Sequence, residues 1–402
     1  MTGMLSVLVS FALVHPAPIR SQSAESLLER ARALHRKYPL IDGHNDLPWS
    51  YRRGGQSVFW ETDISGHREG GQTDIPRLRA GGVGGQFWSV YVPVTLGADE
   101  AVRITKEQIG IVYKLCKRYP DAFEIAWTAD DVERVFAKGK IASLIGMEGG
   151  HSINNSLETL HDMYRLGARY MTLTHSRNTP WADSATDDRQ HGGLTDFGKQ
   201  VVREMNRLGM LVDLSHVSPE TMHDALDVAT APVIFSHSGA RALCDHVRNV
   251  PDDVLRRLKK NGGIVMVVVF RAYTSGPYAE WQKKRTEQRR RLDVQGVGVQ
   301  VIERQMQEWE KQNPAPEATL SQVADQIDHI KRVAGIDHIG IGSDFDGGGG
   351  VAGLEDVSKF PYLTAELLRR GYSDEEIGKI LGLNALRCLR EAEKVSAHLR
   401  RR

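Results

Sequence analysis

The sequence is poor in cysteine, and its charges of opposite sign almost cancel. Three cysteines, Cys116, Cys244 and Cys388, stand far apart among 402 residues, which excludes both a disulfide-rich scaffold and a cysteine-based zinc finger. The 52 Lys and Arg residues face 51 Asp and Glu residues, for a net charge of +1, so the composition predicts no nucleic-acid partner. Hydrophobic residues make up 41% and charged residues 26%, which is typical of a globular protein and excludes a disordered chain.

Long apolar runs are also missing. The run at residues 4–14 has 11 residues, fewer than the roughly 20 that a membrane-spanning helix needs. It suits the apolar part of a signal peptide, because the polar stretch 15–25 follows it. We therefore expect residues 1–25 to be a signal peptide or a disordered N-terminus of an exported, periplasmic or extracellular protein; a buried N-terminal element in a cytoplasmic protein is the alternative. Residues 397–402 carry no apolar tail, so we expect no stable membrane anchor.

The chain instead alternates short apolar runs with amphipathic helical patterns. This alternation indicates parallel strands joined by helices, and eight strands predict a (β/α)8 barrel, here one catalytic domain over residues 26–402. An open doubly wound sheet is the alternative, but residues 41–44 after the start of the first strand read IDGH, not the glycine-rich turn of such folds. The predicted strands are 40–41, 85–92, 141–146, 170–174, 210–214, 233–235, 263–270 and 338–342. The predicted helices are 107–118, 129–137, 156–166, 196–208, 219–228, 251–260 and 320–333.

Residues 277–316 interrupt this alternation. Six basic residues lie between Lys283 and Arg291, and such a cluster could form a surface for a nucleic acid or a protein partner. Acidic residues such as Glu280, Glu287 and Asp293 are interspersed with them. The mixed charge favours a solvated helical insertion at about 277–316, between the seventh and eighth strands.

Metal-binding or charged side chains follow most of the predicted strands. The carboxyl ends of barrel strands meet at one face, where barrel enzymes place their active sites. Residues that are scattered in the sequence are therefore expected to form a ring in space. In chain order these residues are His44, Asp46, Glu148, His151, His175, His216, His237 and Asp344.

Five of these residues form a plausible ligand set for metal ions. Each alone is explained as well by a structural role, such as a buried, hydrogen-bonded histidine. Together they offer nitrogen and oxygen ligands without sulfur, which suits Zn²⁺ or a similar divalent ion at a catalytic site. Five ligands are too many for one open zinc site, but they suit two ions if Glu148 bridges them. The five predicted ligands are His44, Asp46, Glu148, His216 and His237.

Seven ordered motifs carry a resemblance to a known family. The chain resembles the membrane (renal-type) dipeptidases, zinc enzymes of the metal-dependent hydrolase superfamily, from about Leu40 to Leu389. Residues 41–49 (IDGHNDLPW) and 173–183 (LTHSRNTPWAD) are the longest of the motifs. The others are residues 148–152, 213–218, 234–238, 248–253 and 342–347.

The resemblance implies a fold, a metal centre and a reaction. It implies a (β/α)8 barrel with two Zn²⁺ ions, one bound by His44 and Asp46 and the other by His216 and His237. Glu148 and a water or hydroxide would bridge the ions. The family hydrolyses free dipeptides, often with a D-residue at the C-terminal position, and some members open β-lactams. A homodimer is also implied.

The resemblance also implies roles for three further residues. His175, Arg248 and Asp344 match the substrate-contacting positions of the family. On this basis a metal-bound hydroxide would attack the peptide carbonyl, and Asp344 would act as general acid and base. His175 would donate to the oxyanion, and Arg248 would hold the C-terminal carboxylate.

Alternatives remain for three of the residues. Asp346 is the rival of Asp344 for the acid–base role. Arg248 could instead form an ion pair with Asp252 or Asp253. We expect His151 to support the metal ligands rather than to bind an ion.

The chain departs from the animal members of the family. Arg177 stands at one half-cystine position, and Gly276 stands about where a partner of Cys244 would lie. We therefore expect Cys244 to be a free, buried thiol and the protein to be a bacterial member.

Other metal-dependent amidohydrolases, which act on cyclic amides, β-lactams or lactones or as deaminases, are the alternative function; they usually begin with a His-x-His pair rather than His44-x-Asp46. A non-catalytic binding protein would be expected to lack a ligand, and none is missing.

Overall fold

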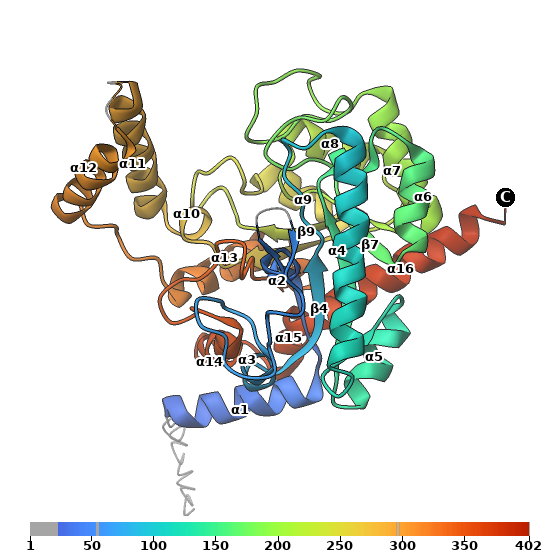
Figure 1. Cartoon of the computed structure of the whole chain (residues 1–402). Coiled ribbons are helices and arrows are strands. Elements are labelled where there is room, and N and C mark those ends of the chain that lie inside the picture. The colour runs from blue at the N-terminus through green and yellow to red at the C-terminus, as the bar shows by residue number, and fades with distance from the viewer. Residues whose placement is uncertain (1–22, 54–55, 295, 297, 402) are drawn as a thin grey trace, which may run out of the picture.

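A closed barrel of eight parallel strands forms the centre of the molecule (Figure 1). The computed structural model describes residues 23–401 except 54–55, 295 and 297, so the predicted signal peptide lies almost wholly outside the described residues. Each barrel strand pairs with the next along the chain, and the last pairs with the first, which confirms the predicted (β/α)8 barrel. The barrel strands are β1 (Leu40–Asn45), β4 (Val83–Ser89), β6 (Ile141–Glu148), β7 (Ala168–Thr172), β8 (Leu211–Asp213), β9 (Ile234–Ser238), β10 (Ile264–Val268) and β11 (Ile339–Gly342).

Helices surround the barrel and follow from local signals in the sequence. Thr128 and Asp131 form a capping box at the start of α5, and Gly209 in the left-handed conformation ends α7. All seven predicted helices are present, although α4 begins at Ala98 rather than at residue 107. They are α4 (Ala98–Arg118), α5 (Ala129–Ala137), α6 (Leu157–Arg165), α7 (Asp196–Leu208), α8 (Pro219–Val228), α9 (Asp252–Asn261) and α13 (Leu320–Val333).

Several elements were not predicted from the sequence. Strand β5 (Phe123–Ile125) pairs with the start of β6 outside the closed barrel, and its three residues are too few for a recognisable pattern. The C-terminal helix α16 (Asn384–Leu399) crosses one side of the barrel, and α1 (Ala24–Lys37) packs on α14 (Phe360–Arg369) (Figure 1). The remaining elements are β2 (Arg52–Arg53), β3 (Gln56–Ser57), α2 (Leu47–Ser50), α3 (Ile75–Ala80), α10 (Arg271–Thr274), α15 (Asp374–Gly378) and the short turns Gly150–Ile153, Ile336–His338, Val357–Lys359 and Lys379–Leu383.

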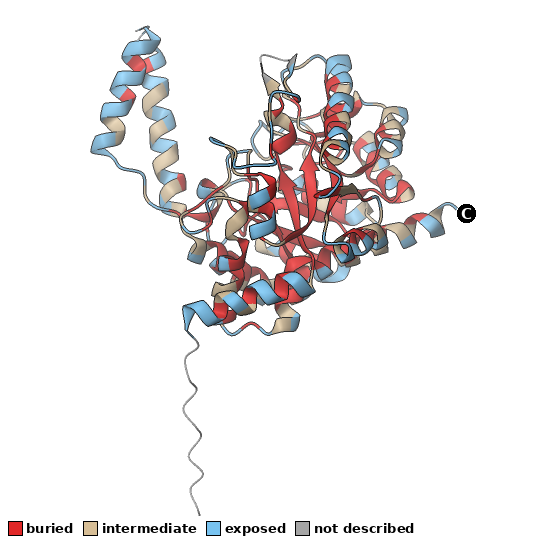
Figure 2. Ribbon diagram, turned by 60° about the horizontal axis from the view of Figure 1, so that its bottom comes forward, coloured by how far each residue is buried: buried red, intermediate tan, exposed pale blue. Residues whose placement is uncertain are grey.

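The strands are buried on both faces, as Figure 2 shows by the red at the centre of the molecule. Inside the barrel, the ring of Tyr170 packs against Phe87, with ring centroids 5.1 Å apart. Gly146 makes room for Tyr170, because a Cβ atom there would lie 2.0 Å from the tyrosine ring. The side chain of Tyr170 can therefore extend through the barrel interior to His44, which its hydroxyl contacts.

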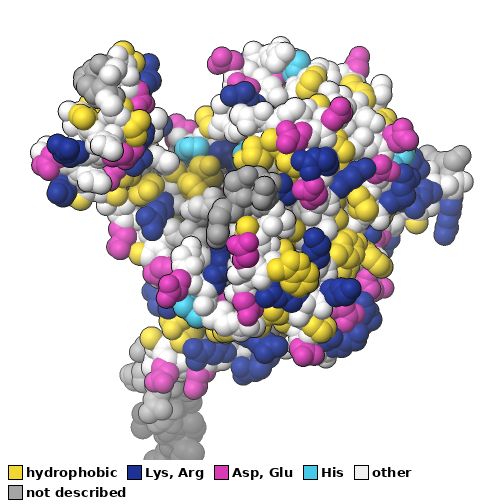
Figure 3. Space-filling view, viewed as in Figure 1, with side chains coloured by type: hydrophobic (Ala, Val, Ile, Leu, Met, Phe, Trp, Pro, Cys, Tyr) yellow, Lys and Arg dark blue, Asp and Glu magenta, His cyan; other side chains and the backbone are white. Residues whose placement is uncertain are grey.

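Two helices, at residues 276–294 and 299–312, form a helical hairpin that projects from the barrel (Figure 1). It consists of α11 (Gly276–Val294) and α12 (Val299–Gln312). Ion pairs from Arg285 to Glu310 and from Arg289 to Glu303 join the two helices. Figure 3 shows Lys and Arg side chains interspersed with Asp and Glu on it, in keeping with a solvated helical segment. That the hairpin is an insertion relative to the family stays a prediction.

The cysteines are free, and Cys244 is buried as predicted. Its thiol donates a hydrogen bond to the carbonyl oxygen of Ala272 at 3.3 Å. Of the helices in residues 23–401 that the structure describes, none has the length and apolar character needed to cross a membrane.

Candidate active site

The predicted site residues converge at the carboxyl ends of the barrel strands. A pocket of about 400 Å³ opens there. Trp49 and Tyr91 line one wall, and Phe270 and Tyr273 line another. His44 is fully buried beside this pocket. The other seven predicted metal, catalytic and substrate residues line it: Asp46, Glu148, His175, His216, His237, Arg248 and Asp344.

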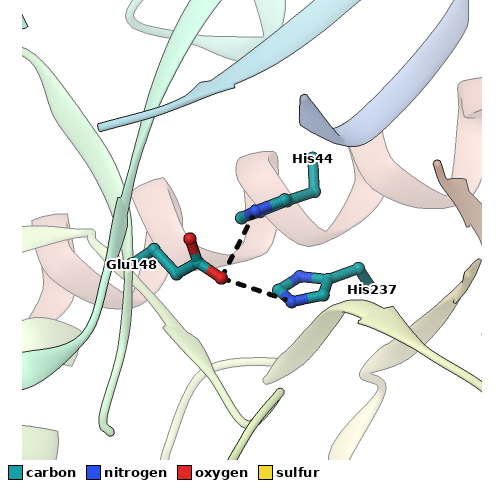
Figure 4. A group of neighbouring side chains, drawn as sticks. All are labelled: His44, Glu148 and His237. Carbon is teal, nitrogen blue, oxygen red and sulfur yellow. Dashed lines mark ion pairs between the residues drawn. The ribbon is translucent and has the colours of Figure 1, made fainter. Parts of the chain in front are cut away.

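The carboxylate of Glu148 lies at the centre of four imidazole rings. Its Oε1 atom is 3.0 Å from His216 Nε2 and 3.5 Å from His44 Nε2. The Nε2 atoms of His237 and His175 are each 3.6 Å from the same oxygen. Figure 4 shows the rings of His44, from β1, and His237, from β9, directed at Glu148. Four histidine nitrogens around one oxygen are the arrangement expected of a polar site built to hold cations.

Hydrogen bonds fix which nitrogen of His44 faces the pocket. The Tyr170 hydroxyl donates to the carbonyl oxygen of Gly43 at 3.1 Å, so its oxygen is left to accept a hydrogen bond from His44 Nδ1 at 2.9 Å. In the neutral, metal-binding form of this imidazole the proton therefore lies on Nδ1, and the Nε2 lone pair is directed at Glu148.

A second chain of hydrogen bonds orients His237 in the same way. The Ser236 hydroxyl donates to Asp213 at 2.6 Å and accepts from His237 Nδ1 at 2.8 Å. Asp213 also accepts from the backbone N–H groups of Ser215 and Ser236. Tyr170, Asp213 and Ser236 were not predicted as site residues, because a buried strand residue carries no signal of such a role in the sequence.

The buried polar atoms and the donor set fit bound metal ions. His44 Nε2 and Asp46 Oδ1 are buried, and neither has a hydrogen-bond partner in the described part of the chain. An unpaired buried polar atom is costly unless a ligand satisfies it. The donor atoms fall into three overlapping groups whose members lie within 4.8 Å of one another: His44, Glu148 and His237; Glu148, His175 and His216; and His44, Asp46 and Asp344.

The overlap of these groups leaves the predicted division of ligands between two ions open. The His44 and His237 rings have centroids 3.9 Å apart, and the His175 and His216 rings 4.4 Å apart. The geometry therefore brings all five predicted ligands together, with His175 and Asp344 beside them. The assignment of His44 with Asp46 and of His216 with His237 stays a prediction.

The electrostatics of the cluster favour the metal-binding forms of His216, His237 and Glu148, whereas Tyr170, Glu148 and Asp46 outweigh burial and raise the pKa of His44 well above its usual value. Burial lowers the pKa values of His216 and His237 well below the usual range, and Arg248 adds to this effect. These imidazoles are therefore neutral, and neutral imidazole is the form that binds a metal. Burial alone would raise the pKa of Glu148, but His44, His175 and His216 hold it well below its usual range, so Glu148 is ionised.

Asp344 lies on a tightly constrained loop. Its φ of 62° is in the left-handed region, which aspartate tolerates better than most residues. Gly347 allows Asp344 and Asp46 to approach each other, because a Cβ atom at Gly347 would lie 2.5 Å from Asp344 Oδ1 and 2.1 Å from Asp46 Oδ2. Burial, together with the Asp46 carboxylate, raises the pKa of Asp344 well above its usual value. A raised pKa suits a group that must take up and release a proton near neutral pH.

Asp346, the rival acid–base candidate, is held by other partners. Its Oδ1 atom accepts from Arg68 NH1 at 2.9 Å and from the backbone N–H of Gln72 at 3.1 Å.

His151 is held by a hydrogen bond between its Nε2 and the carbonyl oxygen of Val92 at 3.1 Å. Burial lowers the pKa of His151 to about 4, so this histidine is neutral.

Arg248 is a buried cation that forms no ion pair with any described residue. Only 2% of its surface is exposed, and none of its three guanidinium nitrogens has a hydrogen-bond partner among the described residues. The ring of Tyr273 lies 5.3 Å away, within the range of a cation–π contact. The alternative interpretation, an ion pair with Asp252 or Asp253, is wrong: these carboxylates contact His329 and His223. An unpaired guanidinium in a pocket is a site for an anion.

Comparison with known proteins agrees with this geometry. Residues 28–402 match the membrane dipeptidase family (peptidase family M19). Dipeptidase 3 from Rattus norvegicus is 43% identical over 375 residues, covering 92% of this chain and 68% of that protein. A probable dipeptidase, PvdM, from Pseudomonas aeruginosa has a structure similar to this one, with a TM-score of 0.79 and 28% identity over 92% of this chain and 99% of that one. A metallopeptidase described as dipeptidase AC has a TM-score of 0.73 and 25% identity over 88% and 98% of the two chains.

The barrel, the histidine and carboxylate cluster and these matches define a metal-dependent hydrolase. The chain belongs to the membrane dipeptidase family, peptidase family M19, and is a metallo-dipeptidase. The resemblance seen in the sequence motifs is therefore confirmed. The predicted bacterial origin stays a prediction, since the matches include mammalian and bacterial proteins.

Proposed function

We propose that this metallo-dipeptidase hydrolyses free dipeptides with two Zn²⁺ ions that Glu148 bridges. The observation that carries the proposal is the unpaired guanidinium of Arg248, which lines the same pocket as the Glu148 cluster. A carboxylate close to the scissile bond is what distinguishes a dipeptide from a longer chain. Bound at this cluster, the ions would activate a water molecule and polarise the peptide carbonyl.

The ligand set of the proposal is His44, Asp46, Glu148, His216 and His237. Glu148 is the natural bridge, because it belongs to two of the three donor groups and its Oε1 atom is within 3.6 Å of four histidine nitrogens. The Ser89 hydroxyl donates to the other carboxylate oxygen, Oε2, at 3.2 Å.

His175 and Asp344 are the proposed catalytic residues. His175 lines the pocket, and burial lowers its pKa, so it is a neutral hydrogen-bond donor for the carbonyl oxygen as negative charge develops there. Asp344 would accept a proton from the attacking water and pass it to the amine that leaves. Its place beside Asp46 puts it at the edge of the ligand cluster.

Arg248 would bind the C-terminal carboxylate of the substrate. A bidentate pair with this carboxylate would satisfy the buried guanidinium and fix the substrate with its peptide bond over the cluster. Tolerance of a D-residue at the C-terminal position, a homodimer and export are further parts of the proposal, and they rest on the family resemblance and the N-terminal sequence.

The test is hydrolysis of a small panel by the zinc-loaded protein, with and without a chelator. The panel contains L-Ala-L-Ala, L-Ala-D-Ala, an N-acetylated dipeptide and a tripeptide. Chelator-sensitive cleavage of the two free dipeptides alone is expected. A penem belongs in the panel as well, because its carboxylate would also satisfy Arg248; cleavage of the penem without the dipeptides would favour a β-lactam hydrolase instead.

Tyr170→Phe is expected to weaken metal binding without removing a ligand. The substitution deletes the hydroxyl that accepts from His44 Nδ1 and leaves the ring in place. Loss of such an orienting partner typically lowers metal affinity about 10–100-fold. A competition titration against a chromogenic chelator measures the change, and Tyr164→Phe, on the outer helix α6, is the control. Equal affinity of Tyr170→Phe and the unaltered protein would show that the hydroxyl does not orient His44.

A further inference from the structure

A second pocket lies directly beside the active site. Its volume is about 470 Å³, and Phe270 and Tyr273 line both this outer pocket and the catalytic one. We propose that the outer pocket is a subsite for an acidic side chain on the C-terminal residue of the substrate, a proposal that rests on the dipeptidase function given above. Lys283 and Arg290 of helix α11 would supply the positive charge.

Helix α11 presents these two cations to the outer pocket on one face. Lys283 and Arg290 are seven residues apart, which places them about two helical turns apart on the same side. Ala279, one turn before Lys283, lines the pocket too and leaves space between the helix and the barrel.

The two cations are available to a ligand. Arg290 has no hydrogen bond or ion pair with any described residue, and Lys283 has only a 4.0 Å contact with Glu280. Glu287 also lines the pocket, but its carboxylate contacts Arg291 at 2.5 Å. With Lys283 and Arg290 against Glu287, the residues that line the outer pocket carry one net positive charge.

The other wall connects this pocket to Arg248. The ring of Tyr273 stacks on Phe270 at 4.5 Å and packs against His246 at 4.6 Å, and the Arg248 guanidinium lies 5.3 Å from the same ring. A substrate whose C-terminal carboxylate is bound by Arg248 would have its last side chain beside Tyr273, at the boundary of the two pockets.

His246 does not contribute a charge of its own. Burial lowers its pKa to about 4; Arg248, Lys283 and Arg241 act in the same direction, and Asp245 opposes them. That Arg248 and Lys283 both act on His246 agrees with their lying on the two sides of one wall. A neutral or basic side chain would gain nothing from Lys283 and Arg290, whereas a carboxylate would be attracted by both.

The experiment compares two substrates of similar shape, L-Ala-L-Glu and L-Ala-L-Gln, on the zinc-loaded protein. We expect kcat/KM to favour the Glu substrate. Because Lys283 and Arg290 are exposed to solvent, the preference should be about fivefold at low salt and should shrink as ionic strength rises. The double variant Lys283→Gln, Arg290→Gln is expected to lose the preference while it cleaves L-Ala-L-Gln at the original rate.

The matched control is Lys284→Gln, which removes one charge from the same helix at a position that does not line the outer pocket. It should retain the preference. Equal cleavage of the two dipeptides by the unaltered protein, or an unchanged preference in the double variant, would overturn the subsite alone. Failure to cleave either dipeptide while L-Ala-L-Ala is cleaved would also overturn the subsite alone, whereas failure on all three would overturn the dipeptidase function and the subsite with it.

Discussion

Asp344→Asn is expected to keep its full metal content and to lower kcat for dipeptide hydrolysis by about 10²–10⁴-fold, the usual contribution of a general acid–base group. The amide has nearly the same shape as the carboxylate, and asparagine adopts the left-handed backbone conformation of Asp344 as readily as aspartate does. The fold and the pocket should therefore persist while the proton acceptor is lost. Steady-state kinetics and metal analysis of the same preparation measure both quantities.

Asp346→Asn is the control for this variant. Asp346 lies two residues away, has a φ of 61° and lines the same pocket, but its carboxylate is paired with Arg68. Asp346→Asn should lower the melting temperature, because the contact with Arg68 is weakened, and should change kcat much less than Asp344→Asn does. Loss of a metal ion from Asp344→Asn would make Asp344 a ligand instead of the proton carrier. A large fall in kcat for Asp346→Asn, with little change for Asp344→Asn, would assign the acid–base role to Asp346.

Arg248→Met is expected to raise KM for free dipeptides about 30-fold or more and to leave the ligand-free protein at least as stable. Removal of one partner of a buried charged pair costs about 2–5 kcal/mol of binding free energy. In the free protein, however, Arg248 has no hydrogen-bond or ion-pair partner to lose among the described residues, and the burial of a cation without such a partner is unfavourable. A structural arginine would show the opposite pattern, with a lower melting temperature and little change in KM.

Dipeptide amides separate the carboxylate contact from other effects of this substitution. L-Ala-L-Ala amide lacks the carboxylate, so the unaltered protein should bind it about as weakly as Arg248→Met binds the free dipeptide. The variant should show no further loss on the amide, because the interaction is already absent. An equal fall for both substrates would mean that Arg248 supports the pocket without contacting the carboxylate.

The barrel and the members of its site could be predicted because both follow from local patterns. Apolar runs specify the buried strands. A His or Glu near the end of such a run, such as Glu148 or His237, is costly to bury unless a hydrogen bond, an opposite charge or a metal ion satisfies it. The parallel barrel then brings all these positions to one end. The distances between these side chains, in contrast, are known only from the structure.

Other features of the site depend on contacts between distant segments. The hydrogen-bond chain from His237 through Ser236 to Asp213 joins two strands. That Arg248 forms no ion pair in the described part of the chain is visible only once Asp252 and Asp253 are seen to contact histidines. The outer pocket likewise could not be predicted, because it forms between α11 and Tyr273, which the sequence alone does not place next to each other. Strand β5 was missed because three residues give no period to detect.

The most direct measurement is a stepwise zinc titration of the chelated protein, with L-Ala-L-Ala hydrolysis followed at each addition. A centre of two ions bridged by Glu148 predicts two tightly bound zinc ions per chain and full activity only after the second. Full activity after one equivalent, or hydrolysis that survives complete removal of metal, would contradict it.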